Sequence, residues 1–188
     1  MVTQRILLDS DAFLCMRKLA ILDPLCRTHS LFVVMTSYIA RHELKDLSKE
    51  VSALETNGCL SIHSVFVRTP EHSEFKRLSN NGIHKGEAEA IAWINGQPQD
   101  QKPAFISNDR GARTAAKENR VETGDVLDLL VCLVQLGSLT KGEAEQLTIS
   151  WGEHPNAFCR PTHYMDFHTT FRTRNVNPEL KHCANSDA

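Results

Sequence analysis

The sequence predicts an α/β fold of three layers (α/β/α), in which a mainly parallel central sheet lies between two layers of helices. Short unbroken apolar runs recur along the chain, which is typical of strands buried on both faces. Segments with helical periodicity alternate with these runs, as they do in βαβ units. The chain has 188 residues, 41% of them hydrophobic, so it is long enough to form one complete core.

The elements can be assigned in chain order. Apolar runs such as RILLD and LFVVM predict strands at residues 5–9, 31–35, 61–67, 104–107 and, briefly, 120–122. Periodic segments between the strands predict helices at 12–22, 37–54, 86–94, 110–119 and 126–136, with a last helix from about 140. The first of these helices is expected to end near Pro24, because proline cannot continue a helix.

Two regions differ in composition. Residues 1–150 carry the alternating pattern and are predicted to form one domain. Residues 151–188 contain three prolines, four histidines and five aromatic residues with little periodicity. We expect an irregular C-terminal extension that packs on the domain or on a partner.

Charge and cysteine usage limit the class of protein. The formal net charge of −2 gives no general attraction to nucleic acid or anionic membranes, so a polyanionic substrate would need a local basic patch. The six cysteines form no CxxC pair, which favours reduced thiols over a disulfide framework. The N-terminus does not resemble a signal peptide, and no apolar run is long enough to span a bilayer. We therefore expect a soluble cytoplasmic protein with no membrane association.

The pentapeptide KGEAE occurs twice, at residues 85–89 and 141–145. In the second copy Thr140 precedes Glu143 by three residues, which is a capping box and fully accounts for that glutamate. In the first copy His84 stands in the cap position, and Glu87 lies in line with Ile91 on the inward side of its helix. A buried unpaired carboxylate is costly, so Glu87 is a candidate functional residue. The alternative is an N-terminal acid stabilised by the helix dipole.

Glu43 poses the same problem. It is predicted to lie on an inward stripe of its helix, and the other members of this stripe are apolar: Ile39, Leu47, Val51 and Leu54. The alternative is a buried glutamate paired with an arginine. Packing alone would place an apolar residue at this position.

Four further aspartates lie next to predicted helix starts. Asp9 and Asp109 follow predicted strands. The alternative to a functional role is that each only caps the helix that comes after it. Asp125 and Asp128 precede a strongly apolar helix and are assigned to capping. Because ligands of parallel sheets bind at the carboxyl ends of strands, Asp9 and Asp109 can meet Glu43 and Glu87 in one pocket. Clustered carboxylates repel unless a cation holds them, and an all-oxygen set selects Mg²⁺ or Mn²⁺.

The segments LLDSDAF, SYIARHEL, GEAEAIA and ISNDRGARTAA, in this order, resemble the PIN-domain nucleases. The likeness is greatest to a short prokaryotic group with a Gly-Glu-Ala-Glu-Ala-Ile helix and an Asp-Asp-x-x-Ala-Arg turn. It covers residues 5–140, and a final ETGDVLDLLVCLVQLGSL adds to it. The extension after about residue 150 lies outside the family pattern.

The resemblance implies a metal-dependent endoribonuclease, a hydrolase of RNA phosphodiester bonds, often the toxin of a toxin–antitoxin pair. Asp9, Glu43, Glu87 and Asp109 match the acidic quartet that serves both as catalytic residues and as ligands for Mg²⁺ or Mn²⁺. Asn108 departs from the frequent Asp-Asp of the last motif. An RNA substrate, an antitoxin protein and a homodimer are the partners that the resemblance implies. No other cofactor is expected.

Basic residues near the quartet are candidates to contact the RNA phosphates. Arg110, Arg113 and Lys117 share one helical face, and Lys85 precedes Glu87. The alternative is a solvated helix face.

Two other functions remain as alternatives, and a zinc site in the extension is a separate candidate. The strand ILLDSDAF also resembles the haloacid-dehalogenase-like phosphohydrolases, with Asp9 as nucleophile and Asp11 as general acid, although Glu43 and Glu87 would then be unexplained. A non-catalytic PIN-like binding module is the second. A zinc site in the extension, from His154, Cys159, His163 and His168, has spacings that match structural zinc motifs poorly.

Overall fold

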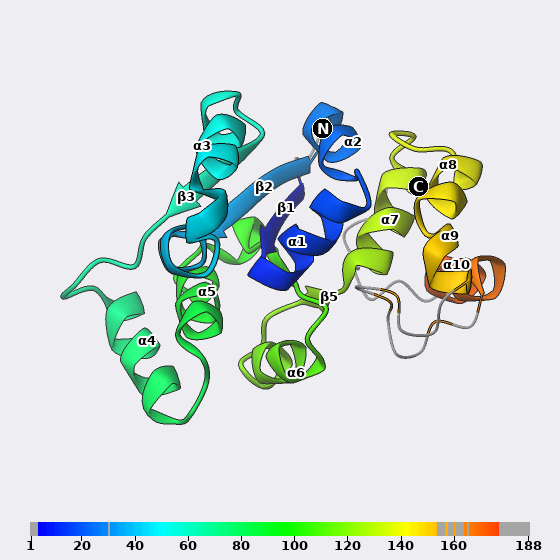
Figure 1. Ribbon diagram of the computed structural model, residues 1–188. Helices are drawn as coiled ribbons and strands as arrows, with labels where there is room; N and C mark the ends of the chain where they lie inside the picture. The colour runs from blue at the N-terminus through cyan, green and yellow to red at the C-terminus, as the bar shows by residue number, and fades with distance from the viewer. Residues whose placement is uncertain are drawn as a thin grey trace.

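The computed structural model describes residues 4–29, 31–153, 157, 160, 164 and 166–176 of the chain (Figure 1). Within these residues the core is one sheet of five parallel strands in the order β3-β2-β1-β4-β5. The strands are β1 (Gln4–Leu8), β2 (Leu31–Thr36), β3 (Leu60–His63), β4 (Ala104–Ile106) and β5 (Thr123–Gly124). The predicted α/β class and parallel sheet are confirmed.

Strand β1 lies at the centre of the sheet. Its Ile6 is in register with Val33 of β2 on one side and with Ala104 of β4 on the other. Leu7 and Leu8 are completely buried because helices cover both faces of the sheet. This explains why the strands are unbroken apolar runs rather than alternating ones.

The helices are α1 (Ser10–Lys18), α2 (Leu22–Arg27), η1 (Ile39–Glu43), η2 (Lys45–Leu47), α3 (Ser48–Thr56), α4 (Pro70–Asn80), α5 (Lys85–Asn95), η3 (Gln99–Gln101), α6 (Arg110–Glu118), α7 (Val126–Gln135), α8 (Lys141–Leu147), α9 (Ile149–Glu153) and α10 (Phe167–Val176). Right-handed crossovers place α1 and α3 on one face of the sheet. The chain then reverses its direction across the sheet, so α5 and α6 cover the other face and contact each other. Helix α7 contacts α1 and belongs to the first face.

Several predicted boundaries are wrong for local reasons. The first predicted helix is interrupted at Ala20, whose φ is 56°, and Pro24 lies in the first turn of α2, where its missing N–H is tolerated. The third strand is shorter than predicted, and helix α4 was not predicted. Thr69 caps α4 and Pro70 begins it, which is a start signal that the sequence does carry.

The C-terminal extension is more regular than predicted. Its described residues include helix α10, which contacts α7. Trp151, Phe167 and Phe171 are buried and belong to the hydrophobic core. The described part of the extension therefore packs on the domain itself, which accounts for its many aromatic residues.

Three described cysteines depart from the expectation of reduced thiols, because Cys26, Cys59 and Cys132 are disulfide-bonded. Cys26, near the end of α2, and Cys59, just before β3, form a disulfide with a Cα–Cα distance of 4.8 Å. They are 33 residues apart in the sequence, and only the fold brings them together. Cys15 is completely buried. Across the described part of the chain, no helix is long and apolar enough to cross a membrane.

The capping boxes predicted for α7 and α8 are both present. Asp125 Oδ1 accepts hydrogen bonds of 3.0 Å from the amides of Leu127 and Asp128, and Asp128 Oδ2 accepts one of 2.8 Å from the Asp125 amide. Glu143 Oε2 accepts a 2.7 Å bond from the Thr140 amide. Glu143 is thus a capping residue, as predicted.

The capping boxes of α7 and α8 differ in burial, since Asp125 is buried and Glu143 is exposed. Replacing Asp125→Ala leaves buried amides without an acceptor and should lower the free energy of unfolding by about 2 kcal/mol, whereas Thr140→Ala should cost about 0.5–1 kcal/mol. Urea denaturation of both variants measures the difference. An equal loss in the two variants would contradict this account of α7.

Candidate functional site

The sheet changes its winding direction between β1 and β4. The chain runs from β1 outward to β2 and β3, then returns to β4 on the other side of β1. Such a switch point leaves an open crevice at the carboxyl ends of the two strands. Asp9 directly follows β1 and Asp109 follows β4 by three residues, and the Asp9 amide donates a 3.0 Å bond to the Ile106 carbonyl. The two strand ends that carry the predicted aspartates are therefore adjacent.

Asp9 caps α1 and is almost completely buried. Its Oδ1 accepts a 2.8 Å hydrogen bond from the Ser10 amide. Burial raises the pKa of Asp9 to about 7, and the charges of Asp11 and Glu43 add to the effect, against hydrogen bonds from Ser107 and Ser10. Asp9 and Glu43 are 34 positions apart in the sequence, and the negative charge of Glu43 contributes the smallest part of this rise in pKa.

Asp11 is a fifth carboxylate of the site. It was considered only for the phosphohydrolase alternative. Its Oδ1 accepts 3.2 Å hydrogen bonds from Ser107 Oγ and from the Asn108 amide, which join the start of α1 to the end of β4. Burial raises the pKa of Asp11. Ser107, completely buried, was also missed. These bonds depend on the register of β1 and β4, which the sequence does not reveal.

Asp109 is exposed and caps α6. Its Oδ1 accepts hydrogen bonds from the amides of Gly111 (2.5 Å) and Ala112 (3.2 Å), and its own amide donates to Ser107 Oγ. Asn108, the departure from Asp-Asp, accepts a 3.1 Å bond from the Val126 amide at the start of α7. Asn108 therefore connects β4 to α7, a structural role that its amide oxygen fulfils without charge.

Glu43 does not face the core, and this prediction is wrong. The predicted single helix over 37–54 is instead a sequence of short elements, of which η1 (Ile39–Glu43) is a π-helical turn closed by the Leu44 amide on the Ile39 carbonyl at 2.9 Å. A π turn contains one residue more than an α turn, so Leu44 takes the buried position and Glu43 is exposed.

The side chain of Glu43 instead lies against the start of α5. A Cβ added to Gly86 would collide with Glu43 Oε1 and would lie 2.9 Å from its Cδ. Glycine at this position therefore leaves room for the carboxylate next to Glu87. The π turn and the glycine together bring Glu43 to the same edge of the sheet as Asp9.

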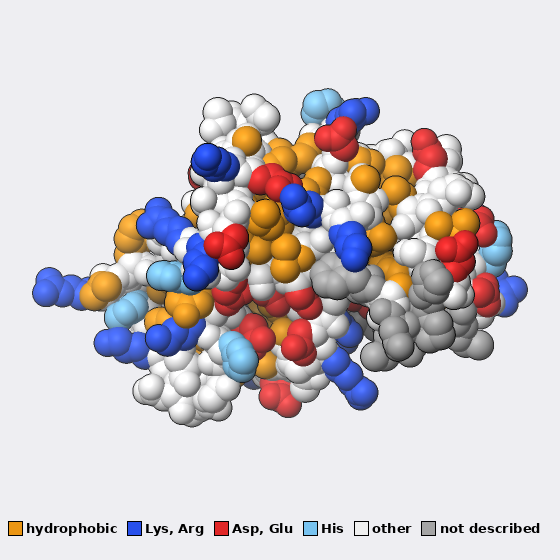
Figure 2. All heavy atoms as spheres, viewed as in Figure 1, with side chains coloured by type: hydrophobic (Ala, Val, Ile, Leu, Met, Phe, Trp, Pro, Cys, Tyr) orange, Lys and Arg blue, Asp and Glu red, His pale blue; other side chains and the backbone are white. Residues whose placement is uncertain are grey.

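Glu87 is half-buried at the first turn of α5. Burial is the main cause that raises the pKa of Glu87. The nearby His84 lowers this pKa, and the negative charges of Asp109, Glu43 and Asp11 raise it further. These interactions connect Glu87 to carboxylates from three other parts of the chain. Figure 2 shows Asp and Glu side chains gathered on one face, in the region between α1 and α6 of Figure 1.

Glu89, two residues further along α5, was not predicted to be important. It is buried, and it accepts hydrogen bonds from Ser37 Oγ (3.1 Å), the Tyr38 amide (2.7 Å) and the Val65 amide (3.5 Å). These donors follow β2 and β3. Glu89 thus braces the ends of two strands against α5, and it supports the turn that carries Glu43.

The donor set fits a hard divalent cation. Asp9, Asp11, Glu43, Glu87 and Asp109 supply only oxygen atoms, and none of them forms an ion pair with a described lysine or arginine. As these side chains stand, no group of three or more His, Cys, Asp or Glu among the described residues is arranged to hold a metal ion. Glu43 is exposed, so rotation about its side-chain bonds can bring its carboxylate closer to the others.

The basic residues predicted to contact phosphates differ in their surroundings. Lys85, Arg110 and Lys117 are exposed. Arg113 is half-buried, and its Nη1 donates a 2.6 Å bond to the Ser107 carbonyl, so it also holds the turn between β4 and α6. Contact of these four residues with phosphate stays a prediction.

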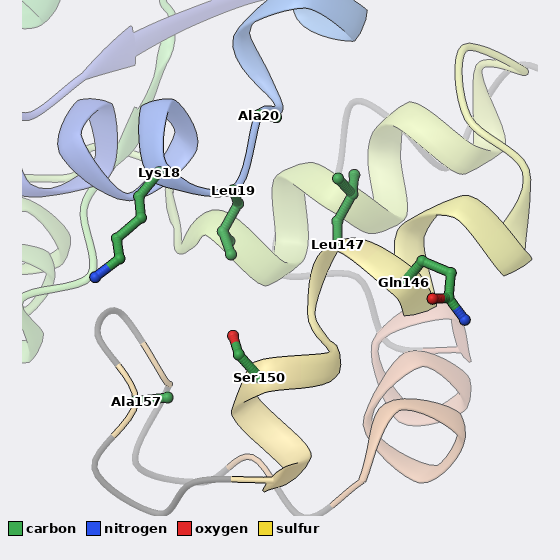
Figure 3. A pocket seen from close by; sticks show the side chains of 7 residues that line it. All are labelled: Lys18, Leu19, Ala20, Gln146, Leu147, Ser150 and Ala157. Atoms are coloured by element: carbon green, nitrogen blue, oxygen red, sulfur yellow. The ribbon is translucent and has the colours of Figure 1, made fainter.

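Two other regions do not contribute to this site. Of the zinc candidates, His154, Cys159 and His163 lie outside the described residues, and His168 Nε2 lies 3.0 Å from Glu145 Oε1. A cavity of about 460 Å³ lies between the end of α1 and helices α8 and α9, and its lining includes Lys18, Leu147 and Ser150 (Figure 3). None of the five carboxylates lines this cavity.

No protein-family model, curated protein or solved structure matches the chain. The function is therefore argued from the geometry of the site.

The raised pKa of Asp9 implies that the stability of the folded protein depends on pH. The folded state holds the proton more tightly than the unfolded state, whose pKa is near 4, so the metal-free protein should lose stability as pH rises from about 4 to about 7. Asp9→Asn keeps the cap on α1 but removes this titration, and should be a few kcal/mol more stable than the wild type at pH 8. Urea denaturation at several pH values in EDTA measures this. Parallel pH dependence of the two proteins would show that Asp9 is not the group responsible.

Proposed function

We propose that the chain is a Mg²⁺- or Mn²⁺-dependent ribonuclease of the PIN-domain type. The observation that supports this most is the position of carboxylates from four separate segments: Asp9 and Asp109 follow the adjacent strands β1 and β4, and the Glu43 carboxylate lies against Gly86, next to Glu87. Stability alone does not explain a group of carboxylates that repel one another at the switch point of a parallel sheet. A divalent cation would remove the repulsion.

In this proposal Asp9, Glu43, Glu87 and Asp109 hold the cation and are the catalytic residues. A bound Mg²⁺ or Mn²⁺ supplies Lewis-acid chemistry, which activates water and offsets negative charge at phosphorus. The protein positions the carboxylates. Asp109 Oδ1 accepts both hydrogen bonds from the backbone amides of Gly111 and Ala112, and these bonds fix the orientation of the carboxylate at the start of α6. Ser107 and Asp11 keep the ends of β1 and β4 together.

The choice of RNA as substrate rests on the likeness of the four sequence motifs to PIN-domain nucleases. The same likeness supports a role as the toxin of a toxin–antitoxin pair, a homodimeric state, a cytoplasmic location and products with 5′-phosphate and 3′-hydroxyl ends. In this proposal Lys85, Arg110 and Lys117, whose side chains are exposed, contact the flanking phosphates.

The phosphohydrolase alternative has one observation in its favour, since burial raises the pKa of Asp11, as a general acid requires. Asp11, however, is engaged by Ser107 and Asn108, and the alternative gives no role to Glu43 and Glu87. Trapping of a phospho-aspartate at Asp9, with no cleavage of RNA, would favour it.

The repeated pentapeptide provides a matched control for catalysis. Glu87→Gln and Asp109→Asn should each lower RNA cleavage in Mg²⁺ or Mn²⁺ by at least about 100-fold, on the order of removing a group that stabilises the transition state. Asparagine caps a helix as well as aspartate does, so Asp109→Asn should fold normally. Glu143→Gln changes the equivalent residue of the second copy, keeps a capping box, and should cleave as the wild type does. Equal cleavage by all four proteins would overturn the assigned site.

Gly86 provides a test of Glu43. In Gly86→Ala the new methyl group must displace the Glu43 carboxylate, which is the end of a flexible side chain, so stability should change little. The affinity for Mn²⁺, measured by isothermal titration calorimetry, should fall about tenfold as one ligand moves away. Gly142→Ala is the control, because nothing lies within 4 Å of a Cβ there. Unchanged affinity in Gly86→Ala would exclude Glu43 as a ligand.

A further inference from the structure

Thr36, the last residue of β2, is completely buried, and among the described residues its Oγ1 has no hydrogen-bond partner. A buried hydroxyl without a partner lowers stability, because it loses its hydrogen bonds to water and gains none within the protein. A valine at this position would fill the same space without that cost. The hydroxyl of Thr36 therefore calls for an explanation other than packing.

Thr36 lies beside Asp9 in the sheet, where β2 is the neighbour of β1 (Figure 1). Val34 of β2 is in register with Leu7 of β1, and Thr36 and Asp9 each follow two residues later. Asp9 has an extended backbone, with a φ of −78° and a ψ of 163°, so the register continues to it. In-register residues of parallel strands point to the same face of the sheet, about 5 Å apart. The Thr36 hydroxyl and the Asp9 carboxylate are therefore neighbours on one face.

The face shared by these two side chains is the one that α5 covers. On its other side Thr36 is in register with His63 of β3, whose ring stacks on Trp93 of α5 with centroids 4.7 Å apart. His63 Nε2 is engaged by Ser61 Oγ at 2.9 Å. Helix α5 also carries Glu87 in its first turn. Thr36 and Asp9 thus face the helix that contributes another carboxylate of the candidate site.

Asp9 shares its other hydroxyl neighbour with a second carboxylate. Leu8 is in register with Ile106, so the next residue of each segment, Asp9 and Ser107, are also neighbours. The Ser107 hydroxyl interacts with Asp9, but it has a single proton and donates at 3.2 Å to Asp11 Oδ1. Thr36 supplies a second hydroxyl on the opposite side of Asp9.

We propose that Thr36 is a positioning residue for the candidate cation site: its hydroxyl donates a hydrogen bond to the charged Asp9 carboxylate and so orients this ligand. The inference rests on the proposed function and adds a residue to the site on which that function depends. Rotation about χ1 of Thr36 turns its hydroxyl from the side of β3 to the side of β1. Residues that orient metal ligands by hydrogen bonds commonly change metal affinity by about 10- to 100-fold when they are replaced.

The test separates metal affinity from stability. Thr36→Val keeps the shape of the side chain and removes the hydroxyl. In EDTA it should raise the urea midpoint by about 0.5 M, because a buried group without a partner is removed. Its affinity for Mn²⁺, measured by isothermal titration calorimetry, should fall about tenfold. Thr36→Ser keeps the hydroxyl and loses a buried methyl group. It should have a lower urea midpoint and still bind Mn²⁺ within about twofold of the wild type.

Thr123→Val is the matched control. Thr123 of β5 is also buried, and its Oγ1 likewise has no hydrogen-bond partner in the described part of the chain. Strand β4 separates β5 from β1. This variant should gain stability as Thr36→Val does and should bind Mn²⁺ as the wild type does.

Each contrary outcome has a distinct meaning. Unchanged Mn²⁺ affinity in Thr36→Val, or an equal loss of affinity in Thr36→Ser or Thr123→Val, overturns the role of Thr36. A merely structural role would make the affinity follow the stability of the variants, which is the opposite of the expected order. If the wild type binds no Mn²⁺, both this role and the metal-dependent function are rejected. Mn²⁺ binding that depends on the Thr36 hydroxyl, without any cleavage of RNA, keeps the role of Thr36 and rejects the proposed nuclease.

Discussion

The burial of carboxylates close to one another is the physical constraint on which the carboxyl edge of this sheet depends. Burial and neighbouring negative charges raise the pKa of Asp9 and of Glu87, so the folded chain keeps these groups together at a cost. The fold imposes the arrangement: the Asp9 amide donates to the carbonyl of Ile106, and the Ser107 hydroxyl donates to the carboxylate of Asp11. In the proposed function a divalent cation relieves the repulsion, so metal binding and stability are coupled.

Several departures from regular structure occur at this same edge. The π turn of η1 exposes Glu43, Gly86 leaves room for its carboxylate, and the buried Glu89 braces the strand ends behind it. Arg68 adopts a left-handed conformation in the turn that follows β3. Such local irregularities are costly and are found preferentially where a protein binds or reacts. Elsewhere in the described chain, capping boxes such as that of Asp125 follow ordinary rules.

The sequence predicts best what depends on local pattern and on the geometry of parallel sheets. Asp9 and Asp109 follow apolar strands, so their convergence needs only the rule that parallel strands end at one edge. Glu43 was expected to face inward because a period of 3.6 was applied across a segment that contains a π turn, and no residue type marks that extra residue. The bonds of Ser107 and the pairing of Cys26 with Cys59 depend on the register and the tertiary fold, which sequence spacing does not encode.

The most direct measurement is an anomalous difference map from a crystal grown with Mn²⁺ and recorded at the manganese absorption edge. The account predicts a peak at the carboxyl ends of β1 and β4, coordinated by oxygen atoms of Asp9 and Asp109 and reached by Glu43 or Glu87, with ligand distances of about 2.0–2.3 Å. A map with no peak at this edge, or with manganese bound only elsewhere on the molecule, would contradict it.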